Sequence, residues 1–240
     1  MFAFLANPDR FMAFSRRAAP IFGAIAGVLI AAGLWLTFTA PEDYQQGDTV
    51  RIMFIHVPAS YMAMFTYLCL GVASFLALVF RHALADAAAR ACAPLGAAFT
   101  ALALITGSLW GKPMWGTWWV WDARLTSVLV LMLLWLGYMA LRAAIDDEVK
   151  AGRAAAILAL AGVVNLPVIH FSVDWWNSLH QGATVFAAER ENRLPPVYLW
   201  PMALMALGYT SAFGSLWLVR IRAEVWRRRA AALALRAAGG

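Results

Sequence analysis

Six stretches of this sequence contain no Asp, Glu, Lys or Arg, and each is long enough to cross a membrane as a helix. A membrane-spanning helix needs about 20 predominantly apolar residues. The strands of a membrane barrel would alternate between apolar and polar residues, and these stretches do not alternate. The sequence therefore predicts an all-α, polytopic membrane protein with six transmembrane helices. The charge-free stretches are residues 18–41, 52–80, 91–111, 125–141, 154–173 and 194–219.

The composition excludes two other classes of protein. Of the 240 residues, 63% are hydrophobic and 13% are charged, whereas a soluble domain has about 25% charged residues. An ordinary soluble enzyme could not bury so much apolar surface, and a disordered chain would be more polar. No repeat or linker divides the sequence, so we expect one domain over 1–240. Its spans are expected near 18–41, 54–80, 91–111, 124–142, 154–172 and 197–219.

The basic residues predict the orientation in the membrane. Six spans place both termini on one side, and 14 of the 19 Lys and Arg residues lie in the termini and in the connectors on that side. Because cytoplasmic segments carry an excess of positive charge, we expect both termini to be cytoplasmic. The first span is too long for a signal-peptide core and is expected to be an uncleaved helix. The basic C-terminal tail is expected to meet anionic membrane lipid, with no role in binding nucleic acid.

Tryptophan is concentrated in the connectors expected on the outer side. The second outer connector, 110–124, reads WGKPMWGTWWVWDAR and holds five of the 12 tryptophans. Four of its residues follow the i, i+3, i+4, i+7 spacing that predicts one face of a short helix: Trp115, Trp118, Trp119 and Asp122. The three indoles would form a flat apolar surface, here called the tryptophan shelf, that suits a planar aromatic ligand. The alternative is an aromatic belt at the membrane interface.

Two histidines lie near these tryptophans in the sequence-derived topology. His56 begins the second span, and His180 follows Trp176 by four residues in the third outer connector, where a short helix would bring Trp176 and His180 together. A flat macrocycle with an axially ligated iron needs an imidazole on each side and an apolar surface for the ring. We therefore predict a haem site with His56 and His180 as the iron ligands. His170 is either a third candidate ligand or a packed polar residue.

Haem also carries two propionates, which need cationic partners. Arg51 and Arg124 are the best placed of the few outer cations, and a guanidinium binds a carboxylate through two parallel hydrogen bonds. Binding to lipid phosphate is the alternative for both arginines. Asp122, directly before the fourth span, is expected either to cap that helix or to contact the haem.

These motifs resemble those of a known family. The segment WGKPMWGTWWVWDARLTS at 110–127 is similar to the tryptophan-rich WWD motif of haem-handling membrane proteins. Its aspartate is followed by Ala123 and Arg124, whereas the long branches of that family usually have a Pro and then an acidic residue. The sequence instead resembles the short branch, the family of haem exporter protein C, also called cytochrome c maturation protein C. The other segments similar to this branch are PEDYQQG at 41–47, RIMFIHVPAS at 51–60 and WWNSLHQGATV at 175–185.

The resemblance implies a cofactor, a location and a set of partners. The WWD segment would bind haem b (iron protoporphyrin IX) at the periplasmic face of the bacterial inner membrane. The protein would not be an enzyme, because it would present haem to a membrane-anchored periplasmic haem chaperone, which takes it covalently. An ATP-binding subunit, a permease-like membrane subunit and a small single-span subunit would complete an ABC-type complex, with ATP hydrolysis in the partner. The residues expected to bind haem are His56, His180, Trp115, Trp118, Trp119, Trp121, Asp122, Arg51, Arg124 and Trp176.

Two rival functions stay open on the sequence alone. A b-type electron-transfer membrane protein would also use two histidines and a haem, but such proteins usually bury their ligands between spans. A transporter or a structural subunit without haem is the other alternative. Transporters mark their sites with intramembrane charges or broken helices. The charge-free stretches lack the first mark, whereas Pro94, Pro167 and Pro201 could provide the second.

Overall fold

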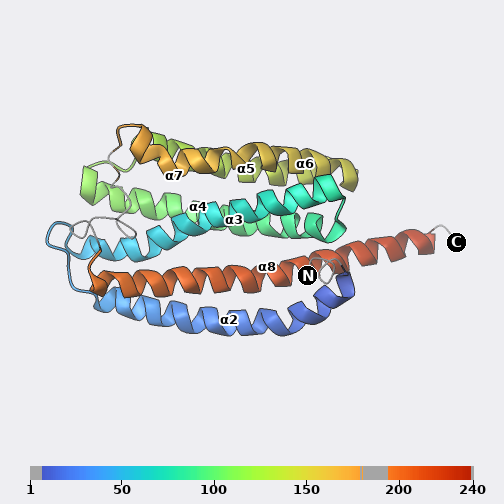
Figure 1. Ribbon diagram of the computed structural model, residues 1–240, viewed down its shortest axis with the longest axis horizontal. Helices are drawn as coiled ribbons and strands as arrows, with labels where there is room; N and C mark the ends of the chain where they lie inside the picture. Colours follow the sequence, from blue (N-terminus) through green and yellow to red (C-terminus); the bar gives the residue numbers. More distant parts are fainter. Residues whose placement is uncertain (1–6, 179, 181–193, 239–240) are drawn as a thin grey trace.

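The computed structural model describes residues 7–178, 180 and 194–238, and most of this part of the chain is helical (Figure 1). Within these residues the strand-like pairing is limited to an isolated bridge between Asp43 and Gly47. The prediction of an all-α fold is therefore confirmed. The elements are α2 (Pro8–Thr39), η1 (Asp48–Ile52), α3 (Met53–Phe80), α4 (Ala83–Trp115), α5 (Ala123–Ala144), α6 (Glu148–Val163), α7 (Asn165–Trp175) and α8 (Pro196–Ala238).

Six helical segments of the described chain are long and apolar enough to cross a membrane, which confirms the predicted number of spans. The fifth span consists of two helices, α6 and α7, which are separated at Val164. Pro167 accounts for the break, because it has no N–H to donate to the carbonyl of Val163. Pro94 and Pro201, by contrast, lie inside the continuous helices α4 and α8.

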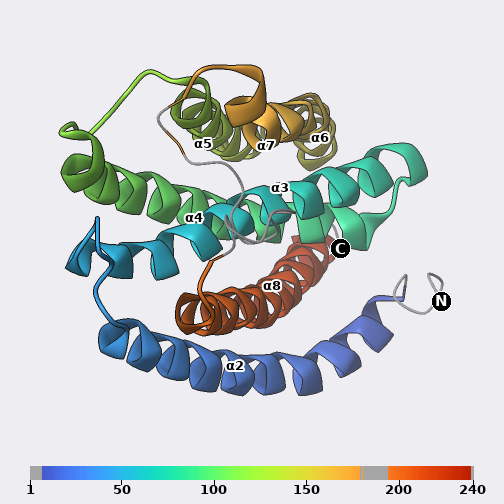
Figure 2. The ribbon, with the colours of Figure 1, turned by 60° about the vertical axis from the view of Figure 1, so that its left-hand side comes forward.

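The helices pack side by side around a central pair, α3 and α4 (Figures 1 and 2). α2 lies along α8 on one side of this pair, and α5, α6 and α7 lie on the other. The fully buried Trp135 of α5 joins the layers, because its ring lies 4.8 Å from that of Tyr67 on α3. Its indole N–H donates to the hydroxyl of Thr100 on α4 at 3.0 Å. Gly96 is required below this ring, since any Cβ there would overlap it.

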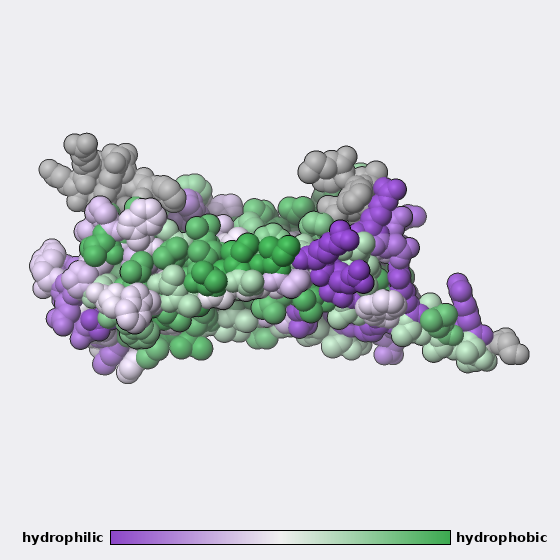
Figure 3. Space-filling model, turned by 90° about the horizontal axis from the view of Figure 1, so that it is seen from below, coloured by the Kyte–Doolittle hydropathy of each residue, from purple (hydrophilic) through white to green (hydrophobic). Residues whose placement is uncertain are grey.

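The two ends of the helix bundle differ in chemistry. α2 begins and α8 ends at the same end, as an even number of spans requires (Figure 1). The visible face in Figure 3 is apolar in the middle, with hydrophilic residues gathered toward both ends. The arginine end, where α8 finishes, contains Asp86, Arg90, Arg142, Glu148, Glu224, Arg227 and Arg228. The histidine end, opposite, contains His56, Trp110, Trp115, Asp122, Ser178 and His180. That the arginine end faces the cytoplasm stays a prediction.

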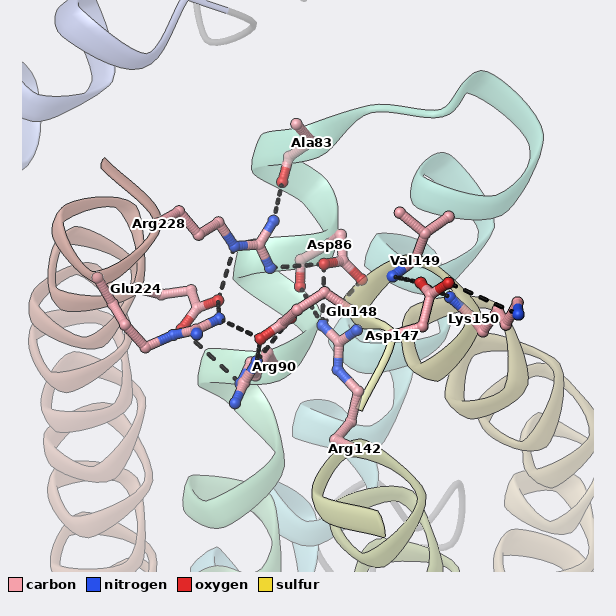
Figure 4. A network of polar contacts seen from close by, with 11 residues as sticks. Ala83, Asp86, Arg90, Arg142, Asp147, Glu148, Val149, Lys150, Glu224 and Arg228 are labelled. Atoms are coloured by element: carbon pink, nitrogen blue, oxygen red, sulfur yellow. Dashed lines mark hydrogen bonds and ion pairs between the residues drawn. The ribbon is translucent and has the colours of Figure 1, made fainter. Parts of the chain in front are cut away.

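Ion pairs connect α4, α5 and α8 at the arginine end (Figure 4). Asp86 accepts hydrogen bonds from Arg142 at 2.9 Å and from Arg228 at 2.6 Å. Glu224 pairs with Arg228 at 2.7 Å and with Arg90 at 3.7 Å. The side chain of Arg142 is only 4% exposed. A buried charge needs an opposite charge beside it, so these pairs hold the three helices together.

Candidate functional site

His180 belongs to a hydrogen-bonded cluster at the histidine end. Its Nδ1 lies 2.8 Å from Oδ2 of Asp122, and the hydroxyl of Ser178 donates to the same oxygen at 2.5 Å. The backbone N–H of His180 donates to the Ser178 hydroxyl at 3.1 Å. The other carboxylate oxygen of Asp122 accepts the N–H of Leu125 at 2.8 Å and so caps α5. The Asp122 side chain, 5% exposed, therefore connects the third outer connector to the start of α5.

These contacts determine the protonation states of the pair. Burial opposes ionisation of Asp122, but the hydrogen bonds from Ser178, Leu125 and His180 outweigh it and lower the pKa of the carboxyl. Burial lowers the pKa of His180 below its ordinary 6.5, although Asp122 acts in the opposite direction. At neutral pH the pair is thus a carboxylate and a neutral imidazole. A carboxylate only accepts hydrogen bonds, so the imidazole proton lies on Nδ1 and the lone pair of Nε2 is free to bind a metal.

His56 is held through the same ring nitrogen, from helix α3. Its Nδ1 lies 3.1 Å from the carbonyl oxygen of Ala103 and 3.1 Å from the hydroxyl of Thr106, both on α4. Because a carbonyl oxygen only accepts, this Nδ1 also carries the proton. Within the described residues, Nε2 has a single contact at the limit of hydrogen bonding, 3.5 Å from the Ser60 hydroxyl. Gly107 leaves room for the ring, since a Cβ there would lie 2.9 Å from His56 Cε1.

Both imidazoles contact tryptophans near the end of α4. The ring of His56 lies 5.7 Å from that of Trp110, and the ring of His180 lies 4.8 Å from that of Trp115, each edge to face. The indole N–H of Trp110 is fixed in turn by the side-chain oxygen of Gln46 at 3.0 Å. Trp110 and Trp115 are five positions apart on α4, so His56 and His180 lie at the same end of this helix. The fold therefore brings together the two histidines that the sequence analysis selected.

The predicted helix through the tryptophan shelf is wrong. α4 ends at Trp115, and Gly116 follows with a φ of 76°, a left-handed conformation that glycine adopts without strain. Residues 116–122 are not helical. Trp118 and Trp119 therefore do not share a helical face with Trp115, because Trp115 lies at a helix end and the other two lie on an irregular segment.

The tryptophans of the irregular segment differ in exposure. Trp118 and Trp121 are 55% and 76% exposed. Trp119 is half-buried, and its ring lies 5.5 Å from that of Trp121. Among the described residues, no group accepts a hydrogen bond from the buried Nε1 of Trp119. The segment thus presents aromatic surface and one unpaired donor, both of which a planar ligand with polar edges could use.

The helix predicted to join Trp176 to His180 is also wrong. α7 ends at Trp175, and Trp176 follows in an extended conformation. The ring of Trp176 packs edge-on against that of Trp175, with 5.7 Å between centroids. The contact expected between Trp176 and His180 is made by Trp115 instead. A direct role of Trp176 in ligand binding stays a prediction.

The two arginines predicted to bind propionates already have partners in the protein. Arg51 forms an ion pair with Asp48 at 2.8 Å, one helical turn away. Arg124 donates to the hydroxyl of Ser172 at 3.2 Å and to the carbonyl oxygen of His170 at 3.4 Å, both on α7. The imidazole of His170 is exposed and packs edge-on against the ring of Phe171. The propionate role of both arginines stays a prediction.

Sequence reasoning missed three residues that fix an imidazole or the tryptophan beside it: Ser178, Thr106 and Gln46. Ser178, two positions before His180, could have been found from the segment itself, because serine often bonds to nearby backbone groups. Thr106 and Gln46 could not, since each acts on a helix far away in the sequence. Their spacing contains no local signal.

Comparisons with known proteins bear on the same residues, because the family model described as "Heme exporter protein C" matches residues 1–236. The chain belongs to this family. It is 54% identical to Heme exporter protein C of Bradyrhizobium diazoefficiens over 229 residues, which cover 95% of this chain and 87% of the relative. The identity to Heme exporter protein C of Escherichia coli K12 is 50% over 201 residues, or 83% and 80% of the two chains. For Paracoccus denitrificans it is 46% over 232 residues, or 96% of each. The predicted membership of this family is thereby confirmed.

Proposed function

We propose that this chain binds haem at the histidine end, with His56 and His180 as axial ligands, and presents it for covalent loading onto a periplasmic haem chaperone in cytochrome c maturation. Membership of the Heme exporter protein C family supports a role in haem handling. The ligand assignment rests on one observation, which is that the two imidazoles are held by the protein in the same way. Each is fixed through Nδ1, has no short hydrogen bond to Nε2 within the described part of the chain, and contacts a tryptophan at the same end of α4.

The donor set fits haem and fits few other groups. Haem iron accepts neutral imidazole on both faces, and metal-bound histidines usually donate their second ring N–H to a carboxylate or a carbonyl oxygen. His180 and His56 have one partner of each kind. Trp115 and the exposed Trp118 and Trp121 provide apolar surface for the macrocycle. Among the described residues, no cluster of three or more His, Cys, Asp or Glu residues favours a bare metal ion.

The proposed task is binding and orientation, with the bond-forming chemistry left to haem b and the chaperone. We place the histidine end on the periplasmic side of the bacterial inner membrane, because the excess of basic residues favours a cytoplasmic arginine end. The proposed partners in the membrane are an ATP-binding subunit, a permease-like subunit and a small single-span subunit, as the family resemblance implies. In this scheme ATP hydrolysis belongs to the partner complex.

Arg51 and Arg124 are proposed to bind the propionates and so to set which edge of the ring faces the chaperone. Each would exchange a present partner for a carboxylate, which a guanidinium binds through two parallel hydrogen bonds. Arg51→Lys and Arg124→Lys keep the charge and lose this geometry. We expect haem to stay bound while covalent transfer to the chaperone falls, measured as chaperone-linked haem on a denaturing gel. Normal transfer in both the Lys and Ala variants would contradict the role.

The ligand assignment is tested by absorption spectra of the purified full-length protein from haem-replete cells. His56→Ala and His180→Ala should each lose the low-spin spectrum of a six-coordinate haem. His82→Ala is the matched control, because His82 lies at the start of α4 near the arginine end and should leave the spectrum unchanged. An unchanged spectrum in both His56→Ala and His180→Ala would exclude the pair, and His170→Ala would then be measured.

Incubation with the haem chaperone separates this function from its main rival. A haem-presenting protein loses its haem to the chaperone, and the spectrum moves with it. A b-type electron carrier keeps its haem and changes only its redox state. Retention of all haem over many equivalents of chaperone would therefore contradict the proposal.

A further inference from the structure

We propose that Asp122 and Ser178 are positioning residues, which hold His180 in place and fix its proton on Nδ1 before haem binds. The inference rests on the proposed function in one respect, because it takes His180 to be an iron ligand. It assigns to the aspartate of the WWD segment a role that is exerted through His180 rather than by contact with haem.

The carboxylate of Asp122 is largely committed to groups of the protein. One oxygen accepts the N–H of Leu125, and the other accepts both the Ser178 hydroxyl and Nδ1–H of His180, which uses three of the about four acceptor sites of a carboxylate. The Asp122 side chain is 5% exposed, against 17% for His180. A ligand at the histidine end would therefore reach His180 more readily than Asp122. The sequence left two functions open for Asp122, helix capping and contact with haem. Capping is observed, and we add orientation of His180 as a further function.

The two candidate ligands differ in what holds their backbone. His56 lies in the first turn of α3, and its backbone is fixed by the helix. His180 follows the end of α7, and the described residues before it, Trp176 to Ser178, are in no helix or strand. Within the described part of the chain, the position of His180 therefore depends on its hydrogen bonds to Asp122 and Ser178. Removing them should affect His180 and leave His56 in place.

The chemical nature of the partner also matters. An imidazole that donates Nδ1–H to a carboxylate is locked in one tautomer and becomes a more basic ligand through Nε2. His56 donates to a neutral carbonyl oxygen instead. The site would thus have unequal axial ligands, with His180 the stronger electron donor, because Asp122 is ionised and buried beside it.

Asp122→Asn is the most informative substitution. Asparagine caps helices as well as aspartate does, so α5 keeps its first hydrogen bond. The amide, however, can donate as well as accept, so it no longer forces the proton onto Nδ1 of His180. Ser178→Ala is the second variant, which removes the hydroxyl bonds to Asp122 and to the backbone N–H of His180 and leaves the contact between Asp122 and His180. Asp147→Asn is the matched control, because Asp147 caps α6 in the same way without a histidine partner.

Two measurements on the full-length protein in lipid nanodiscs decide the question. In the haem-free protein with ¹⁵N-labelled histidine, the ring nitrogen shifts of His180 should indicate the Nδ1–H form, and Asp122→Asn should convert it to a mixture. In titrations with haemin, Asp122→Asn should raise the Kd by about 10–100-fold and move the reduction potential of the bound haem to a more positive value. Ser178→Ala should raise the Kd by about 2–10-fold, and Asp147→Asn should change neither quantity.

The possible outcomes separate the two proposals. An unchanged tautomer and a haemin Kd within about twofold of the wild type in Asp122→Asn would overturn the positioning role and leave Asp122 as a helix cap. A low-spin spectrum that persists in His180→Ala would overturn the ligand assignment instead. The tautomer measurement needs no haem, so it tests the positioning of His180 whichever result the spectrum gives.

Discussion

The arginine end and the histidine end both bury carboxylates beside cationic or titratable partners, but they do so in different ways. At the arginine end, Asp86 and Glu224 are each shared by permanently charged arginines that are all carried by helices (Figure 4). At the histidine end, Asp122 pairs through Nδ1 with a histidine that lies outside the helices, and Nε2 of this histidine has no hydrogen bond among the described residues. In the first arrangement each carboxylate is paired with charges of the protein. The second one offers a nitrogen to a ligand.

The residues around these carboxylates also differ between the two ends. At the arginine end the buried side chains of Arg142 and Glu224 are paired, and the loss of a partner would leave an unpaired charge in the interior. Exposed indoles at the other end, such as Trp118 and Trp121, leave apolar surface in contact with solvent or lipid. Stability and ligand binding are therefore expected to separate between the two ends, and the following substitutions test how completely they do.

The largest effect is expected from Asp86→Asn at the arginine end. It removes the ionised partner of Arg142, whose side chain is almost fully buried, and an uncompensated buried charge costs about 3–5 kcal/mol. We expect a clearly lower melting temperature, with the haem content per folded protein unchanged. Thermal unfolding and an absorption spectrum measure the two quantities. A loss of haem in the fraction that remains folded would show that the two ends are coupled.

Trp115→Ala should have the next largest effect, and at the other end. Stacking of an aromatic side chain on a planar nucleobase contributes about 1–3 kcal/mol, and Trp115 also contacts His180. We expect a weaker haemin affinity with little change in melting temperature. The more exposed Trp118→Ala should lose less, and the triple variant with Trp119→Ala should lose most of the haem. Full haem content in the triple variant would show that these indoles do not bind haem and form only an aromatic belt at the membrane interface.

Gly107→Ala should have a smaller effect on the same site. Its Cβ would lie 2.9 Å from the ring of His56, so the imidazole must shift by some tenths of an ångström. Gly27→Ala on α2 is the control, because no atom lies within 4 Å of the added Cβ. Haemin titration should give a weaker affinity for Gly107→Ala alone. Equal affinities in both variants would contradict a closely fitted His56.

The smallest effect is expected from the exposed cap at the arginine end, Asp147. The N–H groups of Lys150 and then Val149 lower the pKa of its carboxyl below the ordinary 3.8. A lowered pKa means that the stabilisation is present above 3.8 and is lost as the pH falls through the folded-state value. The melting temperatures of the wild type and Asp147→Ala should differ slightly at neutral pH and converge once the pH falls below the folded-state pKa of Asp147. A difference that stays constant down to the lowest pH at which the protein is folded would exclude the carboxylate as the cause.

Much of this architecture could be predicted from local patterns, because burial in lipid constrains each segment by itself. A charge-free stretch of sufficient length forms a spanning helix whatever its neighbours are, so the six spans followed from the sequence. The sequence also allowed His56 and His180 to be selected as candidates, since one lies at the start of a span and the other in a connector expected on the same side. One local signal was missed. Gly116 directly after Trp115 is a typical helix terminator, and it already argued against a helix through Trp118 and Trp119.

The tertiary structure alone decided how the site is held together. The bonds from Asp122 to His180 and from His56 to Ala103 join residues 58 and 47 positions apart, and no periodicity within one segment encodes such distances. The break at Val164 was also decided by the tertiary structure. The sequence offered three prolines that could break a helix, and of these only Pro167 lies next to a break. Local sequence determines which segments span the membrane and which side chains reach their ends. Packing between helices determines which ring nitrogen is bonded and which is left free, because that choice depends on atoms supplied by other helices.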